Sequence, residues 1–324
     1  MIALNETASR AGIGDGVLNI KKPAEWTSHD VVAKLRNLLK VGRIGHGGTL
    51  DPAATGVLPI LIGRATRIAE YLLDWDKEYL AVMRLGETTD TQDATGVVLT
   101  RSQVDQVTRA DLDGTIARFR GRIRQLPPMY SAVKVGGAPL YRAARAGKTV
   151  ARELRDVMVH ELEVLGLDGR DVSMRVRCSK GTYIRTLCAD IGSVLGVGAH
   201  LLALERTRVG PLKLTEASTL EDAKDLQGLA GRLISMDQAL THLPALVVEQ
   251  DAADRATRGV PVPFHSIRWP QSPESQAEPE RSLVRLKDPA ERLLGVGRIQ
   301  PEEMAGRWIA IEKILIDVNE EGAR

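Results

Sequence analysis

GHGGTLDPAATG, residues 45–56, is the most informative stretch of this chain. It places one carboxylate, Asp51, in a glycine-rich segment whose backbone a ligand can approach closely. Pro52 disfavours a helical conformation at Asp51 and favours an extended one. No Gly-Lys-Ser/Thr follows the glycines, which excludes a phosphate-binding P-loop. The spacing alone fits two interpretations, a turn capped by an aspartate or a loop that presents a catalytic carboxylate.

Hydrophobic patterning around this loop predicts strands and helices without a regular βαβ rhythm. Strands are expected at 16–20, 56–62 and 79–85, and a hairpin at 157–178 that turns at Asp168-Gly169. Helices are expected at 28–40, with Ser28 as N-cap, at 65–73 and at 183–195. This mixture predicts the α+β class rather than a doubly wound sheet.

A length of 324 residues predicts two domains. We expect a variable N-terminal tail over 1–16, a catalytic domain over 17–242 and a smaller domain over 243–324. Residues 270–281 are rich in Pro, Ser, Glu and Gln, which predicts a mobile insertion in the second domain.

The composition predicts a cytoplasmic protein. An apolar fraction of 43% and a charged fraction of 27% are ordinary for a soluble globular chain. No apolar run reaches the roughly 18 residues of a membrane span, and the N-terminus lacks the pattern of a signal peptide. The two cysteines, Cys178 and Cys188, have neither metal-ligand spacing nor the density of a disulfide scaffold.

Positive charge is concentrated in one segment of a nearly neutral chain. The net charge is +2, yet residues 118–155 contain a single acid, Glu153, among basic residues. A local basic stretch indicates a polyanion site, although a solvated helix face would have the same composition. The basic residues of the stretch are Arg118, Arg120, Arg122, Arg124, Lys134, Arg142, Arg145, Lys148, Arg152 and Arg155.

Residues 45–56 resemble the catalytic motif of the TruB family of tRNA pseudouridine synthases, G-H-T-G-x-L-D-P-x-A-T-G, with Gly47 in place of the usual threonine. The similarity covers about residues 17–215 and continues in family order. The further motifs are Lys77-Glu78-Tyr79, Leu85–Asp93 (LGETTDTQD), Gln125–Lys134 (QLPPMYSAVK) and Cys178–Arg185 (CSKGTYIR).

The resemblance implies a pseudouridine synthase fold, a mixed and largely antiparallel sheet flanked by helices, with a smaller PUA-like β domain at the C-terminus. It implies a thumb that clasps RNA at about 120–155. It also implies a monomer that binds the T-arm of tRNA and needs neither a metal nor another cofactor. The activity it implies is conversion of uridine-55 in the T-loop to pseudouridine. The alternatives are a tRNA-binding or tRNA-folding module with secondary catalysis, and a synthase for another uridine.

The resemblance also assigns roles to individual residues. Asp51 attacks the sugar or the base, or stabilises charge at C1′, and Arg185 pairs with its carboxylate. Tyr79 stacks on the target base, and His46 occupies the space that the flipped base leaves. Tyr183 and Leu204 line the pocket, and the predicted RNA-binding residues other than His46 are Lys22, Lys134, Arg142, Arg145 and Arg152.

Asp90 and Asp93 lie in the segment Asp90–Gly96 (DTQDATG), whose spacing lacks the alternating oxygen ligands of a calcium loop. We therefore expect both carboxylates to cap turns.

Overall fold

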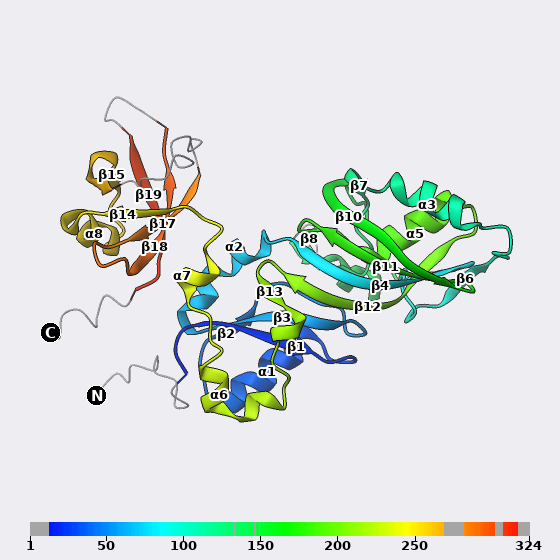
Figure 1. Ribbon diagram of the computed structural model, residues 1–324, viewed down its shortest axis with the longest axis horizontal. Helices are drawn as coiled ribbons and strands as arrows, with labels where there is room; N and C mark the ends of the chain where they lie inside the picture. The colour runs from blue at the N-terminus through cyan, green and yellow to red at the C-terminus, as the bar shows by residue number, and fades with distance from the viewer. Residues whose placement is uncertain are drawn as a thin grey trace.

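The computed structural model describes residues 13–131, 134–135, 137–145, 147–148, 150–268, 282–301 and 307–316. The predicted insertion over 270–281, and residues 1–12 of the predicted tail, lie outside these ranges. Within them the chain forms a long curved sheet, with a separate smaller sheet near the C-terminus (Figure 1).

The large sheet is built from nine strands, and its layout confirms the predicted α+β class. Its main path runs β1-β3-β12-β4-β11-β10-β7, while β2 pairs with β3 and β13 with β12. Every pair is antiparallel except β12 with β3. In chain order the strands are β1 (Gly16–Lys22), β2 (Ile44–His46), β3 (Thr55–Ile62), β4 (Lys77–Leu85), β7 (Gly121–Gln125), β10 (Arg155–Asp168), β11 (Asp171–Cys178), β12 (Ala199–Val209) and β13 (Leu212–Lys213).

Helices cover this sheet. They are α1 (Ser28–Leu39), α2 (Ala69–Leu73), α3 (Arg109–Ala117), α4 (Leu140–Arg145), α5 (Ile184–Val194), α6 (Leu226–Ala230) and α7 (Met236–Ala239), with short 3-10 turns at Gly63–Ile68, Leu214–Glu216 and Asp222–Lys224. Two small hairpins join β5 (Glu87–Thr89) to β6 (Val98–Arg101) and β8 (Lys134–Val135) to β9 (Ala138–Pro139).

Two local predictions are wrong. Thr27, not Ser28, caps α1, because Asp30 lies three residues after Thr27 and completes a reciprocal capping box with it. The helix expected over 65–73 is a 3-10 turn followed by the short α2.

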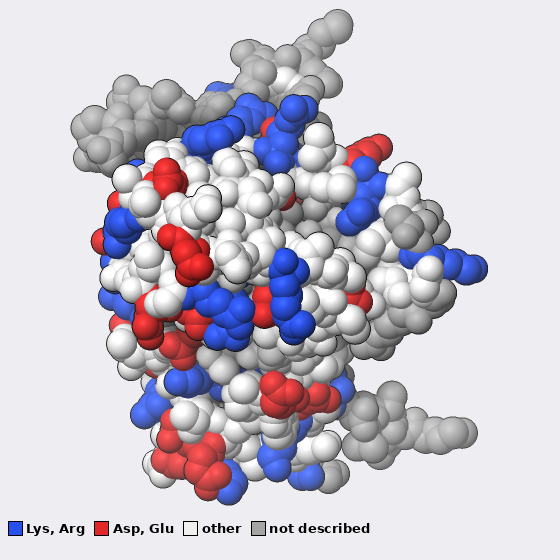
Figure 2. Space-filling model, turned by 90° about the vertical axis from the view of Figure 1, so that its right-hand side faces the viewer, with Lys and Arg blue, Asp and Glu red and all other residues white. Residues whose placement is uncertain are grey.

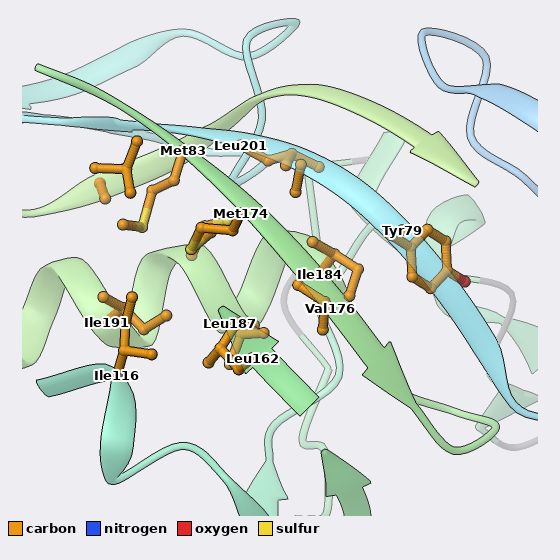
Figure 3. Packing of buried hydrophobic residues seen from close by; sticks show 14 of the residues in the cluster. Tyr79, Met83, Ile116, Leu162, Met174, Val176, Ile184, Leu187, Ile191 and Leu201 are labelled. Atoms are coloured by element: carbon orange, nitrogen blue, oxygen red, sulfur yellow. The ribbon is translucent and has the colours of Figure 1, made fainter. Parts of the chain in front are cut away.

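Helix α5 lies against the centre of the sheet, and its apolar face forms part of the core beside the glycine-rich stretch. Ile184, Leu187 and Ile191 are buried against strand residues such as Met174 and Met83, as Figure 3 shows. The same cluster includes Leu50, Ala54 and Tyr79, so the glycine-rich stretch is packed directly onto this core.

The smaller sheet runs β15-β19-β18-β17-β14-β16 and forms a C-terminal β domain. Its elements are β14 (Ala245–Val248), α8 (Gln250–Thr257), β15 (Val262–Pro263), a 3-10 turn at Phe264–Ser266, β16 (Ile267–Arg268), β17 (Leu283–Lys287), β18 (Leu293–Ile299) and β19 (Trp308–Ile314). Val296 and Leu315 share one apolar cluster with Tyr71 of α2 and with Trp75, which lies between α2 and β4. This shared core attaches the smaller sheet firmly to the larger one.

Charges of both signs intermingle on the end of the molecule that Figure 2 faces. Part of the predicted basic stretch is likewise occupied within the protein. Arg122 pairs with Asp156 at 3.0 Å, and Arg120 donates two hydrogen bonds to the carbonyl oxygen of Leu162. Two arginines of the stretch therefore already have partners within the protein.

Candidate active site

The backbone on both sides of Asp51 is held by buried polar side chains. The hydroxyl of Ser28 donates to the carbonyl oxygen of Leu50 (3.2 Å) and accepts from its N–H (3.0 Å). On the other side, the ammonium of Lys22 donates to the carbonyl oxygen of Pro52 at 2.9 Å. Asp51 thus sits in a segment that is pinned at the residue before it and at the residue after it.

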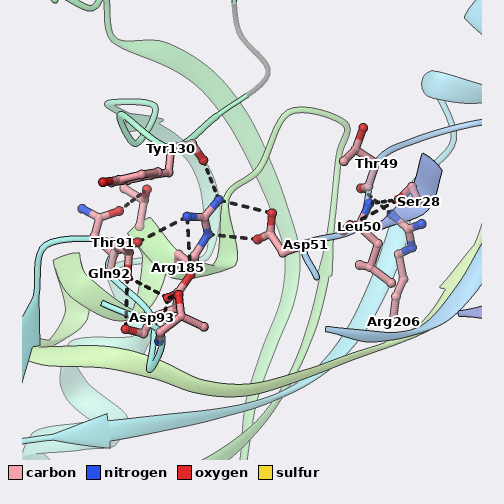
Figure 4. Close-up of polar contacts among 12 residues, drawn as sticks. Ser28, Thr49, Leu50, Asp51, Thr91, Gln92, Asp93, Tyr130, Arg185 and Arg206 are labelled. Carbon is pink, nitrogen blue, oxygen red and sulfur yellow. Dashed lines mark hydrogen bonds and ion pairs between the residues drawn. The ribbon is translucent and has the colours of Figure 1, made fainter. Parts of the chain in front are cut away.

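Arg185 faces Asp51 across the site (Figure 4). Its Nε lies 3.0 Å from Oδ2 of Asp51, and its Nη2 lies 3.4 Å from Oδ1. The arginine side chain is only 6% exposed, whereas the aspartate side chain is 41% exposed. The guanidinium is therefore part of the interior, and the carboxylate faces an opening that a ligand can reach.

Three further oxygens fix the orientation of Arg185. Its Nη2 donates to the carbonyl oxygen of Tyr130 (2.8 Å), and its Nη1 to that of Thr91 (3.3 Å). Oδ2 of Asp93 also lies 3.5 Å from Nη1. With so many acceptors around a planar fork, Arg185 has little freedom to leave Asp51.

Asp93 was assigned only a capping role by the sequence, and that part of the prediction is confirmed. Its Oδ1 accepts hydrogen bonds from the hydroxyl of Thr91 and from the N–H and hydroxyl of Thr95. Asp90 likewise accepts from the N–H of Val97. The approach of Asp93 to Arg185 was missed, because it joins residues far apart in the chain.

Gln125 is a second residue that sequence reasoning missed. Its side chain is buried; its amide donates to the carbonyl oxygen of Tyr183 (3.2 Å), and its side-chain oxygen accepts from the Tyr183 N–H (3.0 Å). Tyr183 is the N-cap of α5, and its own side chain makes no capping hydrogen bond. Gln125 therefore anchors the start of the helix that carries Arg185.

Opposing effects act on the protonation of Asp51. Burial raises the pKa of the Asp51 carboxyl above its ordinary value, while the guanidinium of Arg185 lowers it. The nearby carboxylate of Asp93 adds to the rise in the pKa. Asp51 is therefore a more basic carboxylate than an exposed aspartate.

Tyr79 and Leu204 lie on neighbouring strands of the large sheet. Tyr79, on β4, is buried, and burial raises the pKa of its hydroxyl to about 12. Leu204, on β12, is half-buried and packs against the cluster that contains Tyr79 and Leu50. The aromatic ring and the leucine thus belong to the apolar wall beside Asp51. Burial also raises the pKa of the hydroxyl of Tyr183.

His46 ends strand β2 and is half-buried, with its ring 5.4 Å from that of His29 in an edge-on contact. Burial lowers the pKa of His46, and the charge of Arg206 acts in the same direction. The imidazole is therefore neutral near pH 7, which suits stacking rather than phosphate binding.

Lys22, predicted to bind RNA, is buried beside the loop of Asp51. Its side chain is 0% exposed, and its ammonium donates to three carbonyl oxygens, those of Pro23, Trp26 and Pro52. Burial lowers its pKa to about 8, against the opposing charge of Asp51. Lys22 organises the loop of Asp51 instead.

The other predicted RNA-binding residues are only partly described. The side chains of Lys134, Arg142 and Arg145 lie outside the described residues. Arg152 is half-buried and donates to the carbonyl oxygen of Pro127 at 2.9 Å. The contact of Arg152 with RNA stays a prediction.

The described ranges offer neither a metal-ligand cluster nor a membrane-spanning helix. No three His, Cys, Asp or Glu side chains there are grouped to hold a metal ion. None of the helices in those ranges has the length and hydropathy needed to cross a membrane.

A reachable carboxylate, gripped by a buried arginine beside an apolar wall, suits nucleophilic or electrostatic catalysis at an electron-poor carbon. The pair sits where the segment before β3 meets the start of α5. The fold and the site thus define an α+β enzyme with an aspartate–arginine centre.

Comparison with known proteins identifies the family. Residues 36–184 match the model of the TruB family pseudouridylate synthase N-terminal domain, and residues 185–243 match that of the tRNA pseudouridylate synthase B C-terminal domain. The chain is 44% identical over 293 residues to tRNA pseudouridine synthase B of Stutzerimonas stutzeri, covering 89% of this chain and 92% of the relative. It is 51% identical over 213 residues to the synthase of that name from Francisella tularensis subsp. novicida, covering 65% and 70%. The chain belongs to the TruB family of pseudouridylate synthases.

Solved structures agree with this assignment. A chain from a Cbf5-Nop10-Gar1 complex superposes with a TM-score of 0.74 at 31% identity, covering 94% of this chain and 86% of that one. A chain from an H/ACA RNP bound to a substrate RNA containing 2′-deoxyuridine superposes with a TM-score of 0.72 at 28% identity, covering 98% of this chain and 92% of that one. The fold is therefore that of pseudouridine synthases. Both matched family models end before β14, so neither describes the small sheet.

Proposed function

We propose that this protein converts uridine-55 in the T-loop of tRNA to pseudouridine, with Asp51 as the catalytic residue. The single observation that carries the proposal is the contact between the reachable carboxylate of Asp51 and the buried guanidinium of Arg185. The relatives named tRNA pseudouridine synthase B support tRNA as the substrate.

In the proposed reaction the target nucleotide first leaves its stack and enters the site, at a cost of roughly a few kcal/mol. Asp51 then acts on the sugar or the base, or stabilises positive charge at C1′, while the N1–C1′ bond breaks. The uracil turns, a C5–C1′ bond forms, C5 loses its proton and N1 gains one. Atoms and charge balance without a cofactor.

The neighbours of Asp51 support these steps. Arg185 keeps the aspartate oriented and favours its charged form. Tyr79 and Leu204 offer an apolar wall to the base, and a stacked base contributes about 1–3 kcal/mol. Tyr183 is the N-cap of the helix that carries Arg185.

We propose that tRNA is held by three parts of the chain. Residues 120–155 act as a thumb, through Lys134, Arg142, Arg145 and Arg152. His46 fills the space of the flipped base. The domain of residues 243–324 acts as a PUA-like module beside the catalytic domain of residues 17–242, in a monomer that works in the cytoplasm.

An Asp51→Asn variant tests the catalytic role, with Asp113→Asn on the exposed face of α3 as the matched control. We expect Asp51→Asn to bind a T-arm transcript with unchanged affinity and to form no pseudouridine, and the control to behave as wild type. Residual turnover by Asp51→Asn would refute the assignment of Asp51. If Asp51→Asn lost both its tRNA binding and its turnover, the alternative of a tRNA-binding module would be favoured.

Mapping pseudouridine in tRNA from cells that lack the protein tests the position. We expect position 55 alone to lose its modification. A change at a different uridine, with position 55 intact, would refute the assignment to the T-loop and favour a synthase with another target.

A further inference from the structure

Arg206 is the most unusual charged side chain among the described residues. It lies on β12 and is among the largest fully buried side chains, at 2% exposure. Its guanidinium donates to carbonyl oxygens, those of Val57 at 2.7 Å, Gly48 at 3.2 Å and Thr49 at 3.3 Å. No carboxylate of the described ranges lies within ion-pair distance of it.

These three carbonyls lie on both sides of Asp51 in the chain. Gly48 and Thr49 precede the aspartate, and Val57 follows it on β3. A single guanidinium therefore closes the segment 48–57 into a loop with fixed ends. Lys22 and Ser28 hold the residues adjacent to Asp51, whereas Arg206 holds the base of the loop.

The strand register places Arg206 between the loop and the tyrosine. Its Cα is paired with that of Gly56 on β3 and with that of Tyr79 on β4. The Arg206 guanidinium lowers the pKa of the Tyr79 hydroxyl. The positive charge of Arg206 thereby acts against the effect of burial on the Tyr79 pKa.

A buried cation without a counter-ion is expensive, because a desolvated charge is costly even when it is hydrogen-bonded. If position 206 served packing alone, an apolar side chain of similar volume would fill it without the cost of a buried charge. A planar fork with five donors can bind both ends of one loop at once. The loop that it closes carries Asp51.

We propose that Arg206 is a positioning residue of the isomerase: its guanidinium holds the loop of Asp51 and the ring of Tyr79 in one fixed arrangement. The inference rests on the proposed function, since it concerns the geometry of Asp51 during the reaction. Arg206 touches neither the base nor the sugar. Its loss changes where the reacting groups stand and leaves the RNA-binding surface in place.

The test uses Arg206→Lys, which keeps the charge but loses the fork, and Arg206→Met, which loses both. Arg285→Lys is the control, because Arg285 is also nearly buried and donates to the carbonyl oxygens of Leu243 and Asp237, far from the site, although it also pairs with the Asp237 carboxylate. The measurements are the single-turnover rate of pseudouridine formation, the Kd for a T-arm transcript and the thermal midpoint of each variant.

We expect Arg206→Lys to lower the single-turnover rate by about 100-fold, the order expected from a misplacement of about 1 Å. The Kd should change by less than about threefold, and Arg206→Met should lose more rate than Arg206→Lys. Arg285→Lys, at a comparable loss of thermal midpoint, should keep its rate. A rate for Arg206→Lys within about threefold of that of Arg285→Lys would overturn the proposal.

Tyr79→Phe provides a second arm that does not depend on stability. If the guanidinium acts partly through the hydroxyl, the combined loss in Arg206→Lys with Tyr79→Phe is smaller than the product of the separate losses. A multiplicative loss would overturn the link to Tyr79. The proposed function fails separately, when the wild type does not modify the transcript or when Asp51→Asn retains activity.

Discussion

Gly56 gives the sharpest test of how the loop of Asp51 is built. Its φ of +106° lies in the region that glycine alone adopts readily. A Cβ added there would lie 2.2 Å from the carbonyl oxygen of Arg206, 2.7 Å from its N and 2.9 Å from its carbonyl carbon. These are backbone atoms of β12, which is paired with β3 at this point, so neither strand can retreat without breaking the sheet.

The expected cost of Gly56→Ala follows from two effects. An unfavourable φ costs about 1–3 kcal/mol, and overpacking costs about 1–3 kcal/mol. The smaller entropy of an unfolded chain with alanine offsets about 0.4–1 kcal/mol. The free energy of unfolding should therefore fall by about 1–6 kcal/mol.

Urea denaturation followed by circular dichroism measures the effect, and Gly114→Ala is the control. Gly114 lies inside helix α3, its φ is helical, and no atom lies within 4 Å of its added Cβ. Alanine should stabilise that helix by about 0.5–1 kcal/mol. If Gly56→Ala unfolds within about 0.5 kcal/mol of the wild type while Gly114→Ala behaves as expected, the close contact between β3 and β12 is not a real constraint.

Three further outcomes are expected. Arg185→Lys should lower the single-turnover rate by about 10- to 150-fold with little change in tRNA affinity, because at least one charge-assisted hydrogen bond worth about 1.5–3 kcal/mol is lost; an equal loss of binding would contradict this. Gln125→Leu should lower the free energy of unfolding by about 1–3 kcal/mol, measured in urea, since the Tyr183 N–H loses its partner, while the Tyr183 carbonyl keeps its bond from the Leu187 N–H; a neutral effect would show that water replaces the amide. The rate of pseudouridine formation should fall as the pH drops through the pKa of Asp51, because the reaction needs its carboxylate. Burial raises that pKa above the ordinary aspartate value of 3.8. A rate that is constant down to pH 4 would exclude a raised pKa for the catalytic carboxylate.

Local patterns predicted the elements well and their contacts poorly. The hairpin of β10 and β11 and the strand β3 could be read from short runs of apolar residues. The cap of α1 was misassigned by one residue, although the Asp30 that completes the capping box was a readable signal for Thr27. Ser28 has a different role, because it binds Leu50, twenty-two positions further along the chain.

In the site, too, local patterns predicted the residues but not their contacts. The likeness of residues 45–56 to a family motif singled out Asp51, and a second motif singled out Arg185, but their 3.0 Å contact exists only after the sheet brings α5 to the loop. Lys22 was predicted to face RNA, yet its ammonium is buried against carbonyl oxygens. A charged residue near a motif does not reveal on which side of the backbone its side chain lies.

The order of residues along the chain thus determined the α+β class, the glycine that the loop requires and the carboxylate available for chemistry, because these depend on neighbours within a few positions. The tertiary structure decided which cation faces Asp51 and which cations are buried. Arg185 and Arg206 are both buried arginines that donate to carbonyl oxygens, but Arg185 also meets the carboxylates of Asp51 and Asp93, whereas Arg206 meets carbonyl oxygens. That difference arises from pairing between strands distant in the chain, which no local pattern encodes.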